Sequence, residues 1–115
     1  MKTIGRHIIA EFYGVAEELI SKKDKVQNII EEIVEKTELT KIGSVYKQFK
    51  PYGVTGIVLI AESHISVHTW PEYKLMNIDI FTCGSLEKAD KAFQLFIEKF
   101  KPEKYRHHII DRGLM

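Results

Sequence analysis

The spacing of hydrophobic and polar residues divides the chain into strand-like and helix-like segments. Residues 3–14, TIGRHIIAEFYG, are expected to form a first strand. Within residues 15–37 apolar side chains recur at helical spacing, which predicts a short turn followed by a main helix. The residues of this apolar face are Val26, Ile29, Ile30, Ile33 and Val34. Ser21 and Asp24 have the spacing of a capping box at the point where the main helix starts.

The second half of the chain reads as several short strands and one more helix. Strand-like segments are expected in residues 39–49, 53–63, 64–70 and 74–83, with turns at Pro51–Gly53 and at Pro71–Glu72. Ser85 has the residue type of an N-cap for a helix over residues 86–100. The apolar face of that helix comprises Ala89, Ala92, Phe93, Phe96 and Phe100. Pro102 ends the helix, and residues 103–113 are expected to form a last strand.

This order of elements predicts an α+β fold. Short, hairpin-like connections in the middle of the chain favour a mainly antiparallel sheet, and the two helices would cover one of its faces in a two-layer sandwich. A chain of 115 residues fits a single domain spanning residues 1–115. Several strands are apolar on both faces, so we expect the uncovered face to meet a second subunit in a homodimer.

Composition limits the class, the partners and the location that we expect for the protein. The hydrophobic content of 44% and charged content of 29% are those of a soluble globular domain. With 17 basic and 16 acidic residues the formal charge is +1, so nothing indicates nucleic acid or an anionic membrane as a partner. We find no signal peptide or membrane-spanning run, and the single cysteine, Cys83, fits a reducing, cytoplasmic location.

One short segment, AESHISVHTW at residues 61–70, is unusually rich in reactive side chains. On a strand, His64 and His68 share one face, whereas Ser63 lies on the other, so a single strand would separate Ser63 from His68. The two histidines would be about 13 Å apart, too far to share one metal ion. His107 and His108 are expected to be surface residues of the last strand, and we expect no metal site.

Two further kinds of chemistry receive little support from the residues alone. A serine hydrolase is disfavoured because the chain has no Gly-x-Ser-x-Gly motif and Ser63 precedes no evident helix. Cys83 ends an apolar strand, where a lone cysteine usually acts as a small buried hydrophobic residue. From composition alone, residues 61–70 would be interpreted as a polar edge strand with hydrogen-bonded histidines.

A resemblance to a known family changes this interpretation. The segments ESHISVHTWPE (62–72) and IDIFTCG (78–84) resemble the prokaryotic S-adenosylmethionine decarboxylases, which are pyruvoyl-dependent proenzymes. The segments GRHIIAEFYG (5–14) and PYGVTGIVLIAES (51–63) resemble the same family. The resemblance implies self-cleavage between Glu62 and Ser63, giving fragments 1–62 and 63–115. Ser63 would become a pyruvoyl group that forms a Schiff base with the substrate, with no need for pyridoxal phosphate.

The resemblance also implies a role for each of several side chains. His68 would transfer a proton during processing, supported by Thr55, where the family usually has serine. Cys83 would donate a proton after decarboxylation. Phe49 would stack on the adenine of S-adenosylmethionine, and Glu72 would bind the ribose hydroxyls. Without the resemblance, Phe49 would be assigned to the core and Glu72 to a solvated turn.

In the family two protomers share each active site. Ser63 and Cys83 of one protomer would then work with four side chains of its partner, namely Phe49, Thr55, His68 and Glu72. Ser63 and His68 could therefore act together although strand alternation separates them within one chain. The product would be the aminopropyl donor for spermidine synthesis. Two alternatives stay open: a relative of the same fold that decarboxylates arginine or ornithine, and an unprocessed binding or regulatory dimer.

Overall fold

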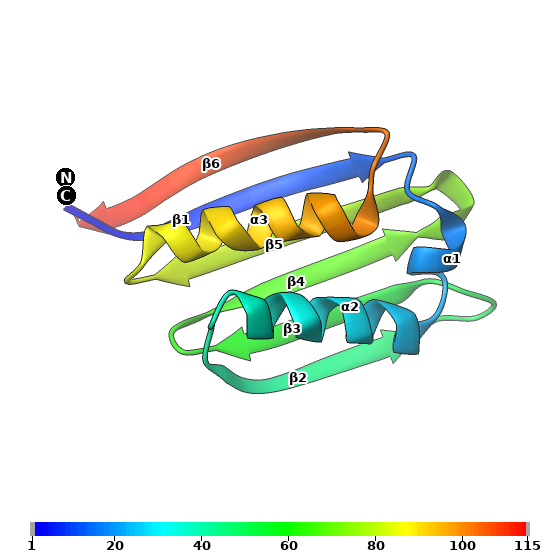
Figure 1. The fold of residues 1–115 in the computed structure, drawn as a ribbon, viewed down its shortest axis with the longest axis horizontal. Helices are drawn as coiled ribbons and strands as arrows, with labels where there is room; N and C mark the ends of the chain where they lie inside the picture. The colour runs from blue at the N-terminus through cyan, green and yellow to red at the C-terminus, as the bar shows by residue number, and fades with distance from the viewer. Residues whose placement is uncertain (1, 115) are drawn as a thin grey trace.

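The computed structural model describes residues 2–114, which form one antiparallel sheet with helices on one side (Figure 1). The six strands are β1 (Lys2–Tyr13), β2 (Lys41–Gln48), β3 (Val54–Ile60), β4 (Ser63–Trp70), β5 (Leu75–Cys83) and β6 (Lys104–Leu114). The helices are α1 (Glu17–Ile20), α2 (Lys23–Lys36) and α3 (Leu86–Phe100), with a 3-10 turn, η1 (Pro71–Tyr73), between β4 and β5. The predicted α+β sandwich is therefore confirmed.

The order of strands in the sheet differs from their order in the chain. It runs β2-β3-β4-β5-β1-β6, so the first strand lies between β5 and β6. Every neighbouring pair is antiparallel. The two ends of the chain consequently lie side by side, because Lys2 at the start of β1 pairs with Leu114 at the end of β6 (Figure 1).

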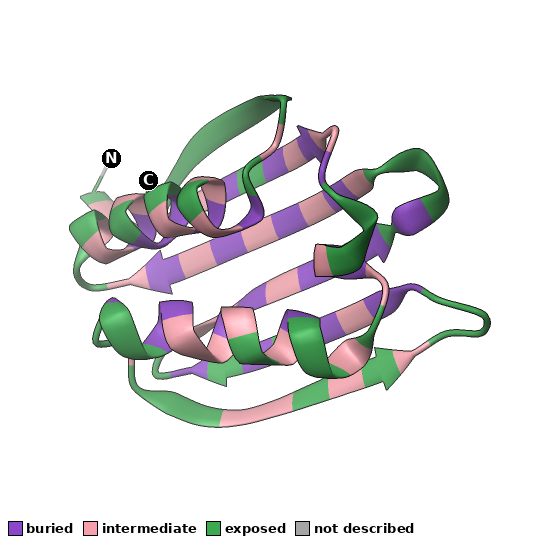
Figure 2. Cartoon of the chain, turned by 45° about the vertical axis from the view of Figure 1, so that its right-hand side comes forward, coloured by how far each residue is buried: buried purple, intermediate pink, exposed green. Residues whose placement is uncertain are grey.

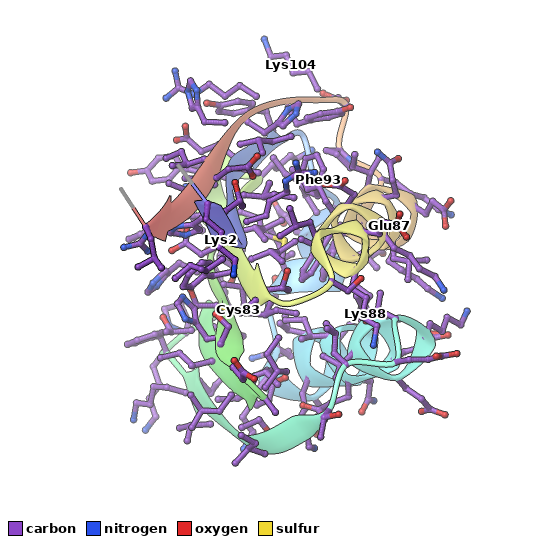
Figure 3. The ribbon with its side chains drawn as sticks, turned by 90° about the vertical axis from the view of Figure 1, so that its left-hand side faces the viewer. Lys2, Cys83, Glu87, Lys88, Phe93 and Lys104 are labelled. Atoms are coloured by element: carbon purple, nitrogen blue, oxygen red, sulfur yellow. The ribbon has the colours of Figure 1, made fainter. Side chains whose placement is uncertain are left out.

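The core lies between the sheet and the two main helices. Viewed along the sheet, both helices pack against the same face and leave the other face uncovered (Figure 3). Buried and less buried residues alternate along the central strands, as expected for a sheet covered on one side (Figure 2). All five residues of the predicted α3 face are buried, and so are four of the five on α2, where Ile29 is partly buried.

The start of α2 differs from the prediction at Ser21 and Asp24. The N-cap residue is Lys22, which makes no side-chain cap, and the Ser21 hydroxyl donates instead to the Glu17 carbonyl at 2.7 Å. The free amide of Lys23 donates to Gln48 Oε1 at 2.6 Å, so a side chain from β2 takes over the function of a cap. The predicted capping box was therefore wrong.

The uncovered face of the sheet, which we call the outer face, carries exposed apolar side chains. Val45, Ile57 and Leu59 are 73%, 45% and 51% exposed, and they lie together on the adjacent strands β2 and β3. The edge strand β6 is exposed along almost all of its length, and the predicted surface positions of His107 and His108 are confirmed. Among residues 2–114, no helix combines the length and the apolar character needed to cross a bilayer.

Candidate active site

Strand β4 places its side chains on two faces as the sequence predicted. Ile65, Val67 and Thr69 are buried on the face that meets the helices. The intervening residues His64, Ser66, His68 and Trp70 face outward, and they are half-buried or exposed. Ser63 belongs by alternation to the buried set, which separates it from His68 within one chain.

Ser63 lies at the start of β4, directly after the tight turn from β3. Its Oγ atom is buried and has no hydrogen-bond partner. Buried hydroxyl groups are nearly always hydrogen-bonded, so an unpaired one calls for an explanation. Ser63 follows Glu62 directly in the chain. Its hydroxyl makes no hydrogen bond within the described chain that would hold it away from the Glu62 carbonyl group.

A hollow of about 570 Å³ opens on the outer face beside this serine, and we call it the serine hollow. Its lining residues come from β3, β4, β5 and β6 and from the turn at Glu62; they are Ile57, Leu59, Glu62, Ser63, His64, Ser66, Phe81 and Arg112. The walls are mainly apolar, with one arginine and one carboxylate. A hollow of this kind has room for the amino-acid part of a small substrate.

Cys83 lies at the same end of the sheet, at the last position of β5 (Figure 3). It is a free, half-buried thiol on the outer face, two residues beyond Phe81. Gly5 of β1 lies directly opposite it in the sheet. A Cβ atom at Gly5 would come within 3.1 Å of the Cys83 Sγ atom and 2.8 Å of the Phe81 ring. Glycine at this position therefore allows the thiol and the Phe81 ring to pack closely against the backbone of β1.

The other candidate residues gather around a second hollow, of about 440 Å³, at the opposite end of β4, and we call it the histidine hollow. Phe49, Thr55, His68 and Glu72 all line it. Thr55 Oγ1 and His68 Nδ1 are 3.0 Å apart, which makes a hydrogen bond between neighbouring strands. Phe49 is 47% exposed, so its ring face is available to a ligand rather than packed in the core.

The structure thus divides the seven predicted site residues into two groups. Glu62, Ser63 and Cys83 lie at one end of the sheet, and the other four lie around the histidine hollow. Ser63 and His68 are five residues apart on one strand, a separation of about 16 Å. Within one chain the two groups cannot act on the same atoms, so the roles assigned to these residues stay predictions.

Three residues near these hollows were given no chemical role from the sequence. Trp70 lines the histidine hollow, and its indole N–H donates to Asn77 Oδ1 at 2.8 Å. His7 lies beside Phe81 on the outer face, on the neighbouring strand, and burial lowers its pKa despite the opposing effect of Asp79. Arg112 lies over the Phe81 ring at 4.9 Å from its centroid. A glycine inside a strand, such as Gly5, indicates close approach of another group, but the sequence does not identify that group as Arg112.

A metal centre receives no support from the geometry. Within residues 2–114, no three His, Cys, Asp or Glu side chains are placed to hold a common ion. The arrangement instead offers an unpaired buried hydroxyl, a thiol near it, and a hydrogen-bonded imidazole at the far end of the same strand. These groups are suited to nucleophilic attack and proton transfer.

Comparison with known proteins defines the class of this two-layer α+β protein. A model of the S-adenosylmethionine decarboxylase family matches residues 6–113, and the chain belongs to that family. The family predicted from the sequence is therefore confirmed, and with it the enzyme class, a carboxy-lyase.

Individual relatives agree with this assignment. An S-adenosylmethionine decarboxylase proenzyme of Archaeoglobus fulgidus is 71% identical over 96% of this chain and 98% of its own length. A proenzyme of the same description from Thermoplasma acidophilum is 52% identical over 97% of this chain and 86% of its own. The crystal structure of the adenosylmethionine decarboxylase of Aquifex aeolicus matches with a TM-score of 0.96 and 42% identity, covering 100% of this chain and 95% of that one.

A more distant structure shares the fold alone. The crystal structure of a Trypanosoma brucei AdoMetDC monomer matches with a TM-score of 0.66 and 15% identity. The match covers 90% of this chain but only 45% of that one.

Proposed function

We propose that the protein is a self-processing, pyruvoyl-dependent decarboxylase of S-adenosylmethionine, cut between Glu62 and Ser63 into fragments 1–62 and 63–115. The observation that carries the proposal is the buried Ser63 hydroxyl, which has no partner within the described chain and follows the Glu62 carbonyl. A hydroxyl in this position fits the precursor of a pyruvoyl group. The product would supply the aminopropyl group for spermidine synthesis, in the cytoplasm.

The cleavage chemistry uses groups that the chain itself provides. Ser63 Oγ attacks the Glu62 carbonyl carbon, and the amide nitrogen leaves with a proton, which converts the peptide bond into an ester. Removal of the Ser63 α-proton then expels Glu62 as a free carboxylate and leaves dehydroalanine. Its imine form reacts with water to give the pyruvoyl group and ammonia. A neutral imidazole such as that of His68 is suited to taking up the α-proton near neutral pH.

A twofold-symmetric homodimer would bring the two separated groups of residues together. If two copies met through their outer faces in opposite directions, the serine hollow of one would face the histidine hollow of the other. The exposed side chains of Val45, Ile57 and Leu59 support this arrangement, because clustered apolar residues on a free sheet face are typical of an interface. His68 and Thr55 of one protomer would then act at Ser63 of its partner.

The histidine hollow has the groups that a nucleoside needs. The Phe49 ring, partly exposed, can stack on adenine, and the Glu72 carboxylate, also exposed, can accept hydrogen bonds from the ribose hydroxyls. Lys50 and Trp70 also line this hollow. Arginine and ornithine have no ring to stack and no ribose, so this hollow favours S-adenosylmethionine over those two substrates.

The pyruvoyl group would supply the electron sink that decarboxylation requires. The chain's own part in that step is to bind the substrate and to manage protons. Cys83 lies on the outer face at the end of the sheet where Ser63 lies, close to the backbone of Gly5. A thiol there can return a proton to the substrate α-carbon after carbon dioxide has left.

One experiment tests the proposal against both rivals. The intact mass of the purified protein is measured first, and carbon dioxide release is then measured with S-adenosylmethionine, arginine and ornithine in turn. We expect two fragments that meet at residues 62 and 63, and release from S-adenosylmethionine only. A single uncut chain after long incubation would favour the unprocessed binding dimer. Release only from arginine or ornithine would overturn the substrate assignment.

The hydrogen bond between Thr55 and His68 gives a second prediction. Replacing Thr55 with valine keeps the size of the side chain but removes the 3.0 Å contact to His68 Nδ1. We expect self-cleavage to slow about ten- to a hundredfold, because the imidazole loses the group that orients it. The rate is followed by denaturing gel electrophoresis. Thr55→Ser is the matched control and should cleave at close to the original rate; equal rates for the valine and serine variants would contradict the role of the hydroxyl.

A further inference from the structure

Arg112 reaches the serine hollow from the edge of the sheet by crossing over a glycine. It lies on β6 opposite Gly5 of β1, and Gly5 in turn lies opposite Cys83 of β5. The Arg112 guanidinium nevertheless lies over the ring of Phe81, on β5. The side chain therefore passes across β1 at the one position where that strand has no side chain. A Cβ atom at Gly5 would come within 2.8 Å of the Phe81 ring, so a larger residue there would displace the ring that the guanidinium contacts.

Arg112 also differs from the other two arginines in its partners. Arg6 pairs with Asp90 and Asp111, and Arg106 pairs with Glu11. Across residues 2–114, no carboxylate lies within ion-pair distance of Arg112. The contact with Phe81 is a cation–π contact, so it pairs none of the guanidinium N–H donors with an oxygen acceptor. These donors are available to a ligand in the hollow.

We infer that Arg112 binds the carboxylate of the substrate amino acid and so determines specificity at the serine hollow. The inference rests on the proposed function. The carboxylate and the amine that reacts at Ser63 are attached to the same carbon, so the carboxylate must lie in the hollow that Ser63 lines. Of the eight residues that line this hollow, Arg112 alone carries a fixed positive charge. Planar, bidentate pairing with a carboxylate is the contact that arginine makes best.

This pairing acts on binding rather than on the chemical step. The carboxylate charge disappears when carbon dioxide leaves, so Arg112 holds the substrate and not the product. Glu62 lines the same hollow and would repel a carboxylate. Arg112 offsets this repulsion, which allows a substrate with a negative group to bind beside the cleavage position.

The test compares two unreactive ligands in Arg112→Gln and in the original protein. The first ligand is the deamino analogue of S-adenosylmethionine, which keeps the carboxylate but cannot react with a carbonyl group. The second is the same molecule with a methyl group in place of the carboxylate. Calorimetry should show the carboxylate ligand binding about ten- to a hundredfold more weakly to the variant. The dissociation constant of the methyl ligand should change less than about twofold, because it makes no charge-assisted contact.

Two further variants make the result decisive. Arg112→Lys keeps the charge and should recover part of the affinity for the carboxylate ligand. Arg106→Gln is the matched control on the same strand, and it should bind both ligands as the original protein does. Equal weakening of both ligands in Arg112→Gln, or no weakening of either, would overturn the inference. Failure of the original protein to bind either ligand would instead contradict the proposed nucleoside substrate, so the two failures are distinguishable.

Discussion

Ser63→Ala protein is expected to stay a single uncut chain and to release no carbon dioxide from S-adenosylmethionine. The alanine methyl group cannot attack the Glu62 carbonyl, so no ester forms and the group that would accept the substrate amine never appears. The intact mass should correspond to the whole chain after prolonged incubation at the temperature at which the original protein is fully cut. We expect the loss of activity to be complete, because no other residue supplies the missing carbonyl group.

Folding of this variant should be unaffected, which separates a chemical effect from a structural one. Ser63 Oγ makes no hydrogen bond within the described chain, so its removal leaves no acceptor without a partner. The thermal unfolding midpoint of the variant should therefore equal or exceed that of the original protein in its uncut form. Ser44→Ala, on β2, is a suitable control and should cleave normally. Two fragments from Ser63→Ala protein would refute the assigned cleavage position.

Cys83→Ala protein should behave in the opposite way, with normal cleavage and poor decarboxylation. The thiol is predicted to act after carbon dioxide leaves, and loss of a positioned general acid typically costs about a hundred- to ten-thousandfold in rate. We expect kcat to fall by this amount while both fragments appear at the usual rate. Steady-state kinetics and intact mass, measured on one preparation, report the two effects separately.

The structure also limits how this second result can be explained. Cys83 is half-buried, and Gly5 opposite it has no side chain, so the Cys83→Ala change leaves only a small space beside the β1 backbone. A fall in activity without a fall in thermal stability would identify loss of the proton donor. Activity within about threefold of the original would show that another group donates the proton.

The parts of the fold that were predicted correctly depend on local patterns. The alternation of Ile65, Val67 and Thr69 with His64, Ser66 and His68 follows from the period of a strand, and it is sufficient to place Ser63 and His68 on opposite faces. The apolar faces of α2 and α3 follow in the same way from helical spacing. Both patterns repeat over a few residues, and each is imposed by a core that covers one side of the element.

The features that were missed depend on contacts between distant parts of the chain. The free amide at the start of α2 is satisfied by Gln48, which is supplied by β2 rather than by the predicted capping box. Arg112 reaches the serine hollow only because β6 pairs with β1 and β1 pairs with β5. Strand order in a sheet is not encoded in hydrophobic spacing, so no pattern around residue 112 could place that guanidinium beside Ser63. The family resemblance named residues by motif, and Arg112 lies outside those motifs.

The order of strands in the sheet bears on what happens once the chain is cut. Residues 1–62 contain β1, β2 and β3, and residues 63–115 contain β4, β5 and β6. Because β1 lies between β5 and β6, the two fragments are interleaved and share three strand pairings: β3 with β4, β5 with β1, and β1 with β6. The proposed cleavage at one turn would therefore leave all three of these strand pairings in place, and neither fragment would carry a complete sheet. The mature protein would behave as one cooperative unit made of two polypeptides, which separate only when the whole sheet unfolds.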